Sequence, residues 1–283
     1  PVNIDDRGDI SHTYVELLPK FTISRSGSFS PYFTFSKGYK AGGYNTQMFS
    51  DVLQQRIMSI MGLSELYTFD KVVSYKPEWS LNYELGAHWQ PGHGLSVDAA
   101  LFYIDCRNQQ LTVFPPGTTT GRMMTNAGRT RSMGVELAST WKPTDDLTLR
   151  VSYGYTNATF RKYNDGRNDY RGKRVPYAPS NTLFGEVNWR ITPLRFMEVT
   201  PSLNVSARCV GNIYWNEANT VSQPFYCLPS VSVAFDAPHW SLRLWADNFT
   251  ATRYNTFYFV SIGNTFVQRG LPRLLGATVR VRI

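Results

Sequence analysis

The chain has 283 residues and a formal net charge of +8, and it is rich in aromatic residues, with 17 Tyr, 17 Phe and 7 Trp. It contains no run of about 18 apolar residues, which excludes a membrane-spanning helix, and no segment that resembles a signal peptide. Its basic residues are scattered rather than clustered, which argues against nucleic acid and favours an anionic ligand or anionic lipid headgroups.

Eleven segments alternate apolar and polar residues with a period of two, which predicts β-strands. The clearest lies at residues 77–90, where apolar residues from Trp79 to Trp89 alternate with polar or small ones. Trp at both ends of an apolar strip is typical of a membrane strand, because the amphipathic ring sits at headgroup depth. The predicted strands cover residues 13–24, 30–39, 77–90, 94–106, 130–142, 146–160, 181–192, 195–211, 225–236, 239–253 and 272–283.

The connections between these strands alternate strictly in length. The short ones are residues 25–29, 91–93, 143–145, 193–194 and 237–238. The long ones are residues 40–76, 107–129, 161–180, 212–224 and 254–271. A soluble sandwich, the alternative for any one strand, mixes long and short connections. The alternation therefore predicts an all-β fold, a transmembrane antiparallel up-and-down β-barrel with short periplasmic turns and long extracellular loops.

The last predicted strand, Arg273–Ile283, has an apolar face from Leu275 to Ile283, with Arg280 and Arg282 on the opposite face. Outer-membrane barrels close with such a strand, so we expect Arg280 and Arg282 at the periplasmic end of the lumen. Eleven strands ending at the periplasmic rim begin outside, whereas bacterial barrels generally have an even number of strands with both ends periplasmic. We therefore expect an odd number of further strands before Pro1.

The three cysteines do not form a framework of their own. Cys209 and Cys227 lie on either side of a predicted loop, so they could face each other across a hairpin and form a disulfide in an oxidising compartment. The alternative is buried or lipid-facing thiols, and Cys106 is left over in either case. The four histidines show no metal-ligand spacing, and the sequence predicts neither a metal site nor a cofactor.

Several segments resemble the carboxyl-terminal barrel half of TonB-dependent outer-membrane receptors. They are Phe35–Asn45, with its Gly-Tyr-Lys-Ala-Gly-Gly-Tyr-Asn run, Tyr75–Glu78, Asn126–Glu136 and Trp245–Tyr254. The resemblance runs from about Tyr14 to the end of the chain, and the first segment looks most like iron-complex receptors. The family usually ends in Phe or Trp, where this chain has Ile283, which puts recognition of the closing strand by the assembly machinery in doubt.

The resemblance implies that residues 1–283 are the carboxyl-terminal part of a 22-stranded barrel, with the first barrel half and an amino-terminal plug domain outside this chain. It also implies a location in the outer membrane and a role in the uptake of a ferric siderophore or another iron complex. The implied partners are the TonB–ExbB–ExbD system, acting through the amino-terminal region, outer-membrane lipid and lipopolysaccharide, and for a glycan importer a surface lipoprotein.

Aromatic and basic residues in the predicted loops suit an anionic, partly aromatic iron chelate, because guanidinium groups pair with carboxylates or catecholates and rings stack on apolar edges. The candidates are Tyr44, Arg129, Arg131, Tyr170, Arg171, Arg174 and Tyr177. Of these, we favour the four arginines as a group. The alternative for each is a solvated loop charge, a lipopolysaccharide contact or an interface aromatic.

Other functions remain open from the sequence. Within the family, cobalamin or a glycan are alternative ligands. Outside it, a passive porin needs no plug, and a barrel hydrolase needs a Ser/His or Asp/His grouping at one rim. The histidines argue against the hydrolase, because His88, His93 and His239 flank short turns and His12 stands alone at the opposite end.

Overall fold

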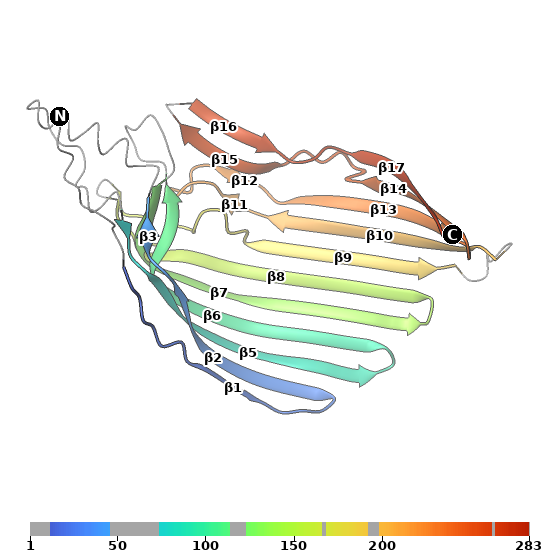
Figure 1. The fold of residues 1–283 in the computed structure, drawn as a ribbon, viewed down its shortest axis with the longest axis horizontal. Helices are drawn as coiled ribbons and strands as arrows, with labels where there is room; N and C mark the ends of the chain where they lie inside the picture. Colours follow the sequence, from blue (N-terminus) through green and yellow to red (C-terminus); the bar gives the residue numbers. More distant parts are fainter. Residues whose placement is uncertain are drawn as a thin grey trace, which may run out of the picture.

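The computed structural model describes residues 12–45, 74–113, 123–165, 168–191, 198–261 and 264–282. Most of them form one antiparallel sheet of eleven strands (Figure 1). The strands are β1 (Lys20–Ser24), β2 (Phe29–Lys40), β5 (Glu78–Gly92), β6 (Leu95–Val113), β7 (Met123–Thr144), β8 (Leu147–Lys162), β9 (Asn181–Arg190), β10 (Thr200–Gly211), β13 (Tyr226–Asp236), β14 (Trp240–Asp247) and β17 (Leu274–Val281). Each pairs with the next of these strands along the chain, so the sheet is an up-and-down meander with β1 and β17 at its edges.

Three two-stranded hairpins lie in the long connections, at the end of the sheet opposite the short turns (Figure 1). They are β3 (Gly43–Tyr44) with β4 (Ser74–Tyr75), β11 (Ile213–Tyr214) with β12 (Ser222–Gln223), and β15 (Asn255–Ser261) with β16 (Asn264–Arg269). The prediction of eleven antiparallel strands is confirmed. Across the part of the chain that the structure describes, no helix is long and apolar enough to cross a membrane.

Several predicted boundaries were wrong, and the strand expected at residues 13–24 begins only at Lys20. Residues 107–113 and 123–129 were expected in a loop, but they continue β6 and β7, because the ladder runs on through Gln110↔Asn126 to Val113↔Met123. The strand expected at 239–253 stops at Asp247, because Asn248 has a positive φ of 47° and its side-chain oxygen accepts a hydrogen bond from the Thr252 amide at 2.9 Å. The predicted turn at 193–194 and the terminal Ile283 lie outside the described residues.

The sheet has two chemically different faces, set by the two-residue period. One face, here called the outer face, carries large apolar side chains in open contact with the surroundings: Leu85 is 57% exposed, Leu101 54% and Leu275 72%. The other, the inner face, carries polar and charged residues such as Glu84 and Glu136. Each of these lies one residue along its strand from an outer-face leucine, Leu85 or Leu137. An apolar face of this extent needs an apolar partner or a bilayer.

Tryptophans mark the two limits of the outer face. Four tryptophans each lie near the end of their strand that adjoins a short turn: Trp89, Trp141, Trp189 and Trp240. On β5, Trp79 lies ten residues before Trp89, which is about 33 Å of strand at ~3.3 Å per residue. At a tilt of about 40° this spans ~25 Å, the height of the apolar band of an outer-membrane barrel.

Three inner-face glycines lie under aromatic rings of the neighbouring strand. Gly86 pairs with Tyr32, and a Cβ on this glycine would lie 2.5 Å from the Tyr32 ring. The same arrangement joins Gly134 to Phe102, with 2.6 Å to the ring, and Gly276 to Trp245, with 2.2 Å. At each of these positions the ring occupies the space that a side chain would need, so the ring lies across the strand next to it.

Cys209 and Cys227 face each other directly across β10 and β13, and a disulfide joins them. The bond lies next to the long connection that carries β11 and β12. Cys106 is a buried free thiol.

Candidate functional site

The connection between β8 and β9 folds back along the end of β8 and forms a small core. Amide–carbonyl hydrogen bonds join Val175 to Ala158 at 3.0 Å and Phe160 to Lys173 at 2.9 Å, so residues 172–175 extend the sheet locally. Phe160 is fully buried, with Tyr163 and Val175 packed beside it. The loop is therefore held in a fixed position by its own apolar core.

Three long connections meet at Tyr177. Its ring stacks on Phe257 of β15, with 5.5 Å between centroids, and meets the edge of Trp215 at 5.3 Å. Its amide donates to the Tyr214 carbonyl at 2.8 Å, and its hydroxyl donates to the Tyr258 carbonyl. We call Tyr177, Trp215 and Phe257 the loop junction, because these residues join the β8–β9 connection to the β11–β12 and β15–β16 hairpins.

A cavity of about 250 Å³ lies beside the loop junction. Its lining combines aliphatic groups, two aromatic rings, a carboxyl group and a carboxamide: Gln110, Leu111, Thr112, Pro176, Tyr177, Glu217 and Phe257. Gln110 is held in place, since its side-chain nitrogen donates to the carbonyls of Ala41 at 2.8 Å and Lys76 at 3.2 Å. The cavity walls are thus drawn from β6 and three connections.

Burial sets the protonation chemistry at this end of the molecule. Desolvation raises the pKa of the Glu217 carboxyl above its usual value, and the nearby Asp165 carboxylate adds to the rise. Desolvation also raises the pKa of Tyr163 and, together with the hydrogen bond from the Tyr170 hydroxyl to Asp165 at 2.7 Å, that of Tyr170. Glu217 is therefore held closer to its neutral, hydrogen-bond-donating form than an exposed glutamate is.

Four predicted site residues lie in the β8–β9 connection, but only Tyr177 lines the cavity. The Tyr170 ring packs on the Tyr163 ring, and the Tyr170 hydroxyl donates a hydrogen bond to the Asp165 carboxylate. Arg171 is 72% exposed and faces Asp169 at 3.8 Å. Arg174 has a structural role, because its guanidinium donates to the Thr156 carbonyl at 3.0 Å.

Arg129 and Arg131 do not line the cavity. In the ladder Arg131 pairs with Asp105 and Arg129 with Arg107, in register with the apolar outer-face residues Leu137 and Leu101. Both arginines therefore lie on the outer face, and the expectation that the four arginines form one group is wrong. Tyr44, on β3, stacks with His12 at 6.2 Å, and within the described ranges its buried hydroxyl has no hydrogen-bond partner.

Six cavity-lining residues were missed by the sequence reasoning, among them Gln110, Glu217 and Phe257. Gln110 was assigned to a loop, whereas it is a buried strand residue. Glu217 is acidic, whereas the predicted site residues are all arginines and tyrosines. A signal for it was present, because Trp215 and Glu217 stand together in a long connection.

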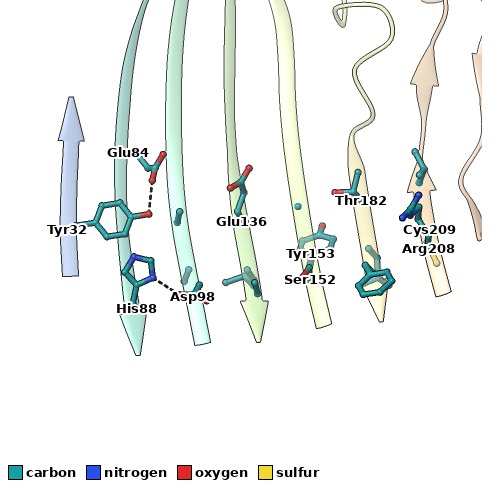
Figure 2. Close-up of a pocket in the computed structure, with 18 residues that line it drawn as sticks. Tyr32, Glu84, His88, Asp98, Glu136, Ser152, Tyr153, Thr182, Arg208 and Cys209 are labelled. Carbon is teal, nitrogen blue, oxygen red and sulfur yellow. Dashed lines mark hydrogen bonds and ion pairs between the residues drawn. The ribbon is translucent and has the colours of Figure 1, made fainter. Parts of the chain in front are cut away.

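A larger hollow of about 550 Å³ lies on the inner face and runs across the sheet from β2 to β10 (Figure 2). Figure 2 shows Tyr32, Glu84, His88 and Asp98 gathered on β2, β5 and β6. The Tyr32 hydroxyl donates to Glu84 at 2.6 Å, and the His88 ring nitrogen lies 2.5 Å from an Asp98 oxygen. The hollow lies against the curved sheet, and its lining combines polar groups, among them Glu84, His88 and Asp98, with alanine, leucine, valine and phenylalanine residues. Over the described ranges no cluster of His, Cys, Asp or Glu is arranged to hold a metal ion.

Comparison with known proteins gives matches over most of the chain. The family model described as TonB dependent receptor-like, beta-barrel matches residues 2–249. The pesticin receptor of Yersinia enterocolitica is 26% identical over 251 residues, which are 88% of this chain and 33% of that receptor. The ferrioxamine receptor of the same organism is 30% identical over 173 residues, 60% of this chain and 22% of that protein.

Solved structures agree in fold. The ferric yersiniabactin uptake receptor of Yersinia pestis superposes with a TM-score of 0.71 at 21% identity, covering 93% of this chain and 36% of that one. The ferric preacinetobactin receptor of Acinetobacter baumannii gives 0.65 at 17% identity, covering 93% and 36%. The chain thus spans about a third of the length of these relatives.

Proposed function

Because this chain belongs to the TonB-dependent receptor β-barrel family, we propose that it forms the wall of an outer-membrane receptor that imports a ferric siderophore or a related iron complex. The observation that carries the proposal is the loop junction with its cavity, where three long connections converge at the end of the sheet opposite the short turns. The names of the relatives support the class of ligand, since they include receptors for pesticin, ferrioxamine and ferric yersiniabactin.

The chemistry of the cavity fits such a ligand. The rings of Tyr177 and Phe257 offer apolar faces for the organic part of a chelate. Desolvation raises the pKa of the Glu217 carboxyl, so this group ionises less readily than an exposed glutamate, and its neutral form can donate a hydrogen bond to a negatively charged oxygen. The described loops also carry exposed cations, among them Arg171, which attract an anionic complex from solution.

In this proposal the inner-face hollow receives a plug domain, and the TonB–ExbB–ExbD system acts on that plug after ligand has bound. A barrel of 22 strands has a lumen wide enough to need such a plug. The polar lining of Glu84, His88 and Asp98 supplies hydrogen-bonding partners for it. The receptor is then a transporter and not an enzyme.

Growth on defined iron sources tests the proposal. A strain that lacks the receptor is grown in iron-depleted medium with single ferric chelates, among them ferrioxamine B and ferric yersiniabactin. We expect loss of growth on at least one chelate, rescue by the wild-type gene, and no rescue when TonB is also removed. Normal growth on every chelate would contradict the iron proposal.

Conductance in liposomes separates the receptor from a passive porin. The receptor, purified at its natural length, is expected to show no large constitutive pore, because the plug fills the lumen. A large, permanently open pore in the intact protein would exclude the transporter and favour the porin.

A further inference from the structure

The cavity beside the loop junction combines a carboxyl group with aromatic rings. Among the lining residues that the structure describes, none is a cation, and only Glu217 carries a charge when it ionises near neutral pH. The rings of Tyr177 and Phe257 line the same space, stacked with 5.5 Å between their centroids. A carboxylate and an aromatic face both attract a positive charge. The lining therefore favours a cationic group over an anionic one.

The loop that carries Glu217 is fixed by hydrogen bonds on both sides of this residue. The Asn216 side-chain oxygen accepts a hydrogen bond from the Thr220 amide at 3.0 Å. Asn219 ties the loop to the β8–β9 connection, because its side-chain oxygen accepts from the Arg174 amide at 2.6 Å and its side-chain nitrogen donates to the Arg174 carbonyl at 3.0 Å. The backbone of Glu217 is therefore held beside the cavity by the protein's own contacts.

The polar groups of the cavity are mainly hydrogen-bond acceptors. The Gln110 side-chain nitrogen already donates to the carbonyls of Ala41 and Lys76, which leaves the oxygen of that amide to interact with a ligand. The Tyr177 hydroxyl donates to the Tyr258 carbonyl, so its donor is also engaged. An ammonium group has three N–H donors and no acceptor, and it complements such a lining.

The Glu217 carboxyl also lacks a compensating charge. Desolvation and the nearby Asp165 carboxylate raise its pKa, and over the ranges that the structure describes Glu217 forms no ion pair. A cation that enters the cavity supplies the missing partner and favours the ionised carboxylate, whereas an anionic group requires the carboxyl to be neutral. Of the two, the cation also gains the attraction of the rings.

We propose that this cavity binds a primary ammonium group on the organic part of the iron complex, so that the receptor prefers chelates with such a group over otherwise identical chelates without it. The ammonium pairs with the Glu217 carboxylate and lies against the rings of Tyr177 and Phe257. The cavity volume of about 250 Å³ is below the roughly 300–1,000 Å³ of pockets for drug-sized ligands, which suits a pendant arm and leaves the iron centre outside. The proposal rests on the proposed function for the iron complex, but not for the ammonium group.

Two chelates that differ only in this group test the preference. The receptor, purified in detergent at its natural length, is titrated with ferrioxamine B, whose chain ends in a primary ammonium, and with its N-acetyl derivative, in which that end is an uncharged amide. We expect the wild type to bind ferrioxamine B about tenfold more tightly. Glu217→Gln should reduce the preference to less than about threefold. Asp169→Asn, which removes a 51% exposed carboxylate from the β8–β9 connection, should keep it within about twofold of the wild-type value.

The n-pentylammonium ion tests the cavity without iron. Its contact with the receptor is measured by saturation-transfer NMR, beside the neutral N-pentylacetamide. We expect a stronger signal for the cation in the wild type and in Asp169→Asn, and loss of that difference in Glu217→Gln. Equal measurable affinities for the two ferrioxamines, or the same pentylammonium signal in the wild type and Glu217→Gln, would overturn the proposal.

The two kinds of failure are distinguishable. If neither ferrioxamine binds, the pentylammonium result alone decides whether the cavity takes an ammonium group. Normal growth of the receptor-deficient strain on every iron chelate, with pentylammonium binding intact, counts against iron uptake and not against the ammonium site. Loss of growth on a chelate without any effect of Glu217→Gln on pentylammonium binding has the opposite meaning.

Discussion

Replacement of Tyr177 by alanine should release the loop junction without unfolding the sheet. The side chain makes aromatic contacts with Trp215 and Phe257 and one hydrogen bond to the Tyr258 carbonyl. These contacts join connections that are separated by tens of residues in sequence. The variant should therefore loosen the β11–β12 and β15–β16 hairpins while β5 to β8 stay protected.

The size of the effect follows from the contacts. Each aromatic pair contributes about 0.5 kcal/mol at the low end of its range, which is appropriate because Tyr177 is 42% exposed. The hydrogen bond contributes about 1 kcal/mol. Together they give about 2 kcal/mol of local opening free energy, or roughly a 30-fold change in an equilibrium constant.

Amide hydrogen exchange measures this opening directly. Amides of the two hairpins should exchange about 30-fold faster in Tyr177→Ala, at ~1.4 kcal/mol per tenfold, and those of the main sheet should be unchanged. Tyr177→Phe keeps both ring contacts and should give only about a fivefold change, from the loss of ~1 kcal/mol. A change of less than threefold in the alanine variant, or equal changes in both variants, would refute the role assigned to the rings.

Three further predictions concern other parts of the chain. Replacing both Cys209 and Cys227 by serine removes a disulfide with a sequence separation of 18. The double variant should lose up to about 3 kcal/mol of folding stability, so the band of the folded protein on a gel should disappear at a lower temperature than in the wild type. The raised pKa of Glu217 means that ionisation opposes folding, so stability is lost as pH rises through the carboxyl pKa. Glu217→Gln should then slow loop exchange at pH 7 and leave it unchanged at pH 4, and an effect of equal size at both pH values would contradict this sign. Gly86→Ala must displace the Tyr32 ring and should destabilise the protein by about 1–3 kcal/mol. Gly185→Ala, with nothing within 4 Å of its new Cβ, should leave stability unchanged. Equal melting temperatures for the two variants would argue against the contact between Gly86 and Tyr32.

The strands could be predicted from the sequence because a two-faced sheet imposes its period on every residue. From Trp79 to Trp89 each apolar residue faces outward and each polar or small one inward, with no exception in the ladder. The same rule would have placed Arg129 and Arg131 correctly. Counting back in twos from Leu137 puts both on the outer face. The error came from taking residues 107–129 as a loop, where that count does not apply.

The loop junction could not be predicted in the same way. Tyr177, Trp215 and Phe257 belong to three connections with no common period, and their contact depends on where each loop folds back. Tyr177 also has a positive φ of 62°, a conformation that the sequence around a tyrosine does not predict. Glu217 acquires its chemical character from burial, which appears only after the loops have packed.

The glycines beneath Tyr32, Phe102 and Trp245 have a consequence for how related sequences change. A ring and a glycine share one volume at each position, so neither can be exchanged alone: a side chain at Gly86 collides with the ring, and loss of the ring uncovers backbone. In homologous barrels we therefore expect the two partners of each pair to vary together, as a ring with a glycine or as two residues of intermediate size. These three correlated pairs, 54, 32 and 31 residues apart, provide a record of strand register that can be read from sequences alone.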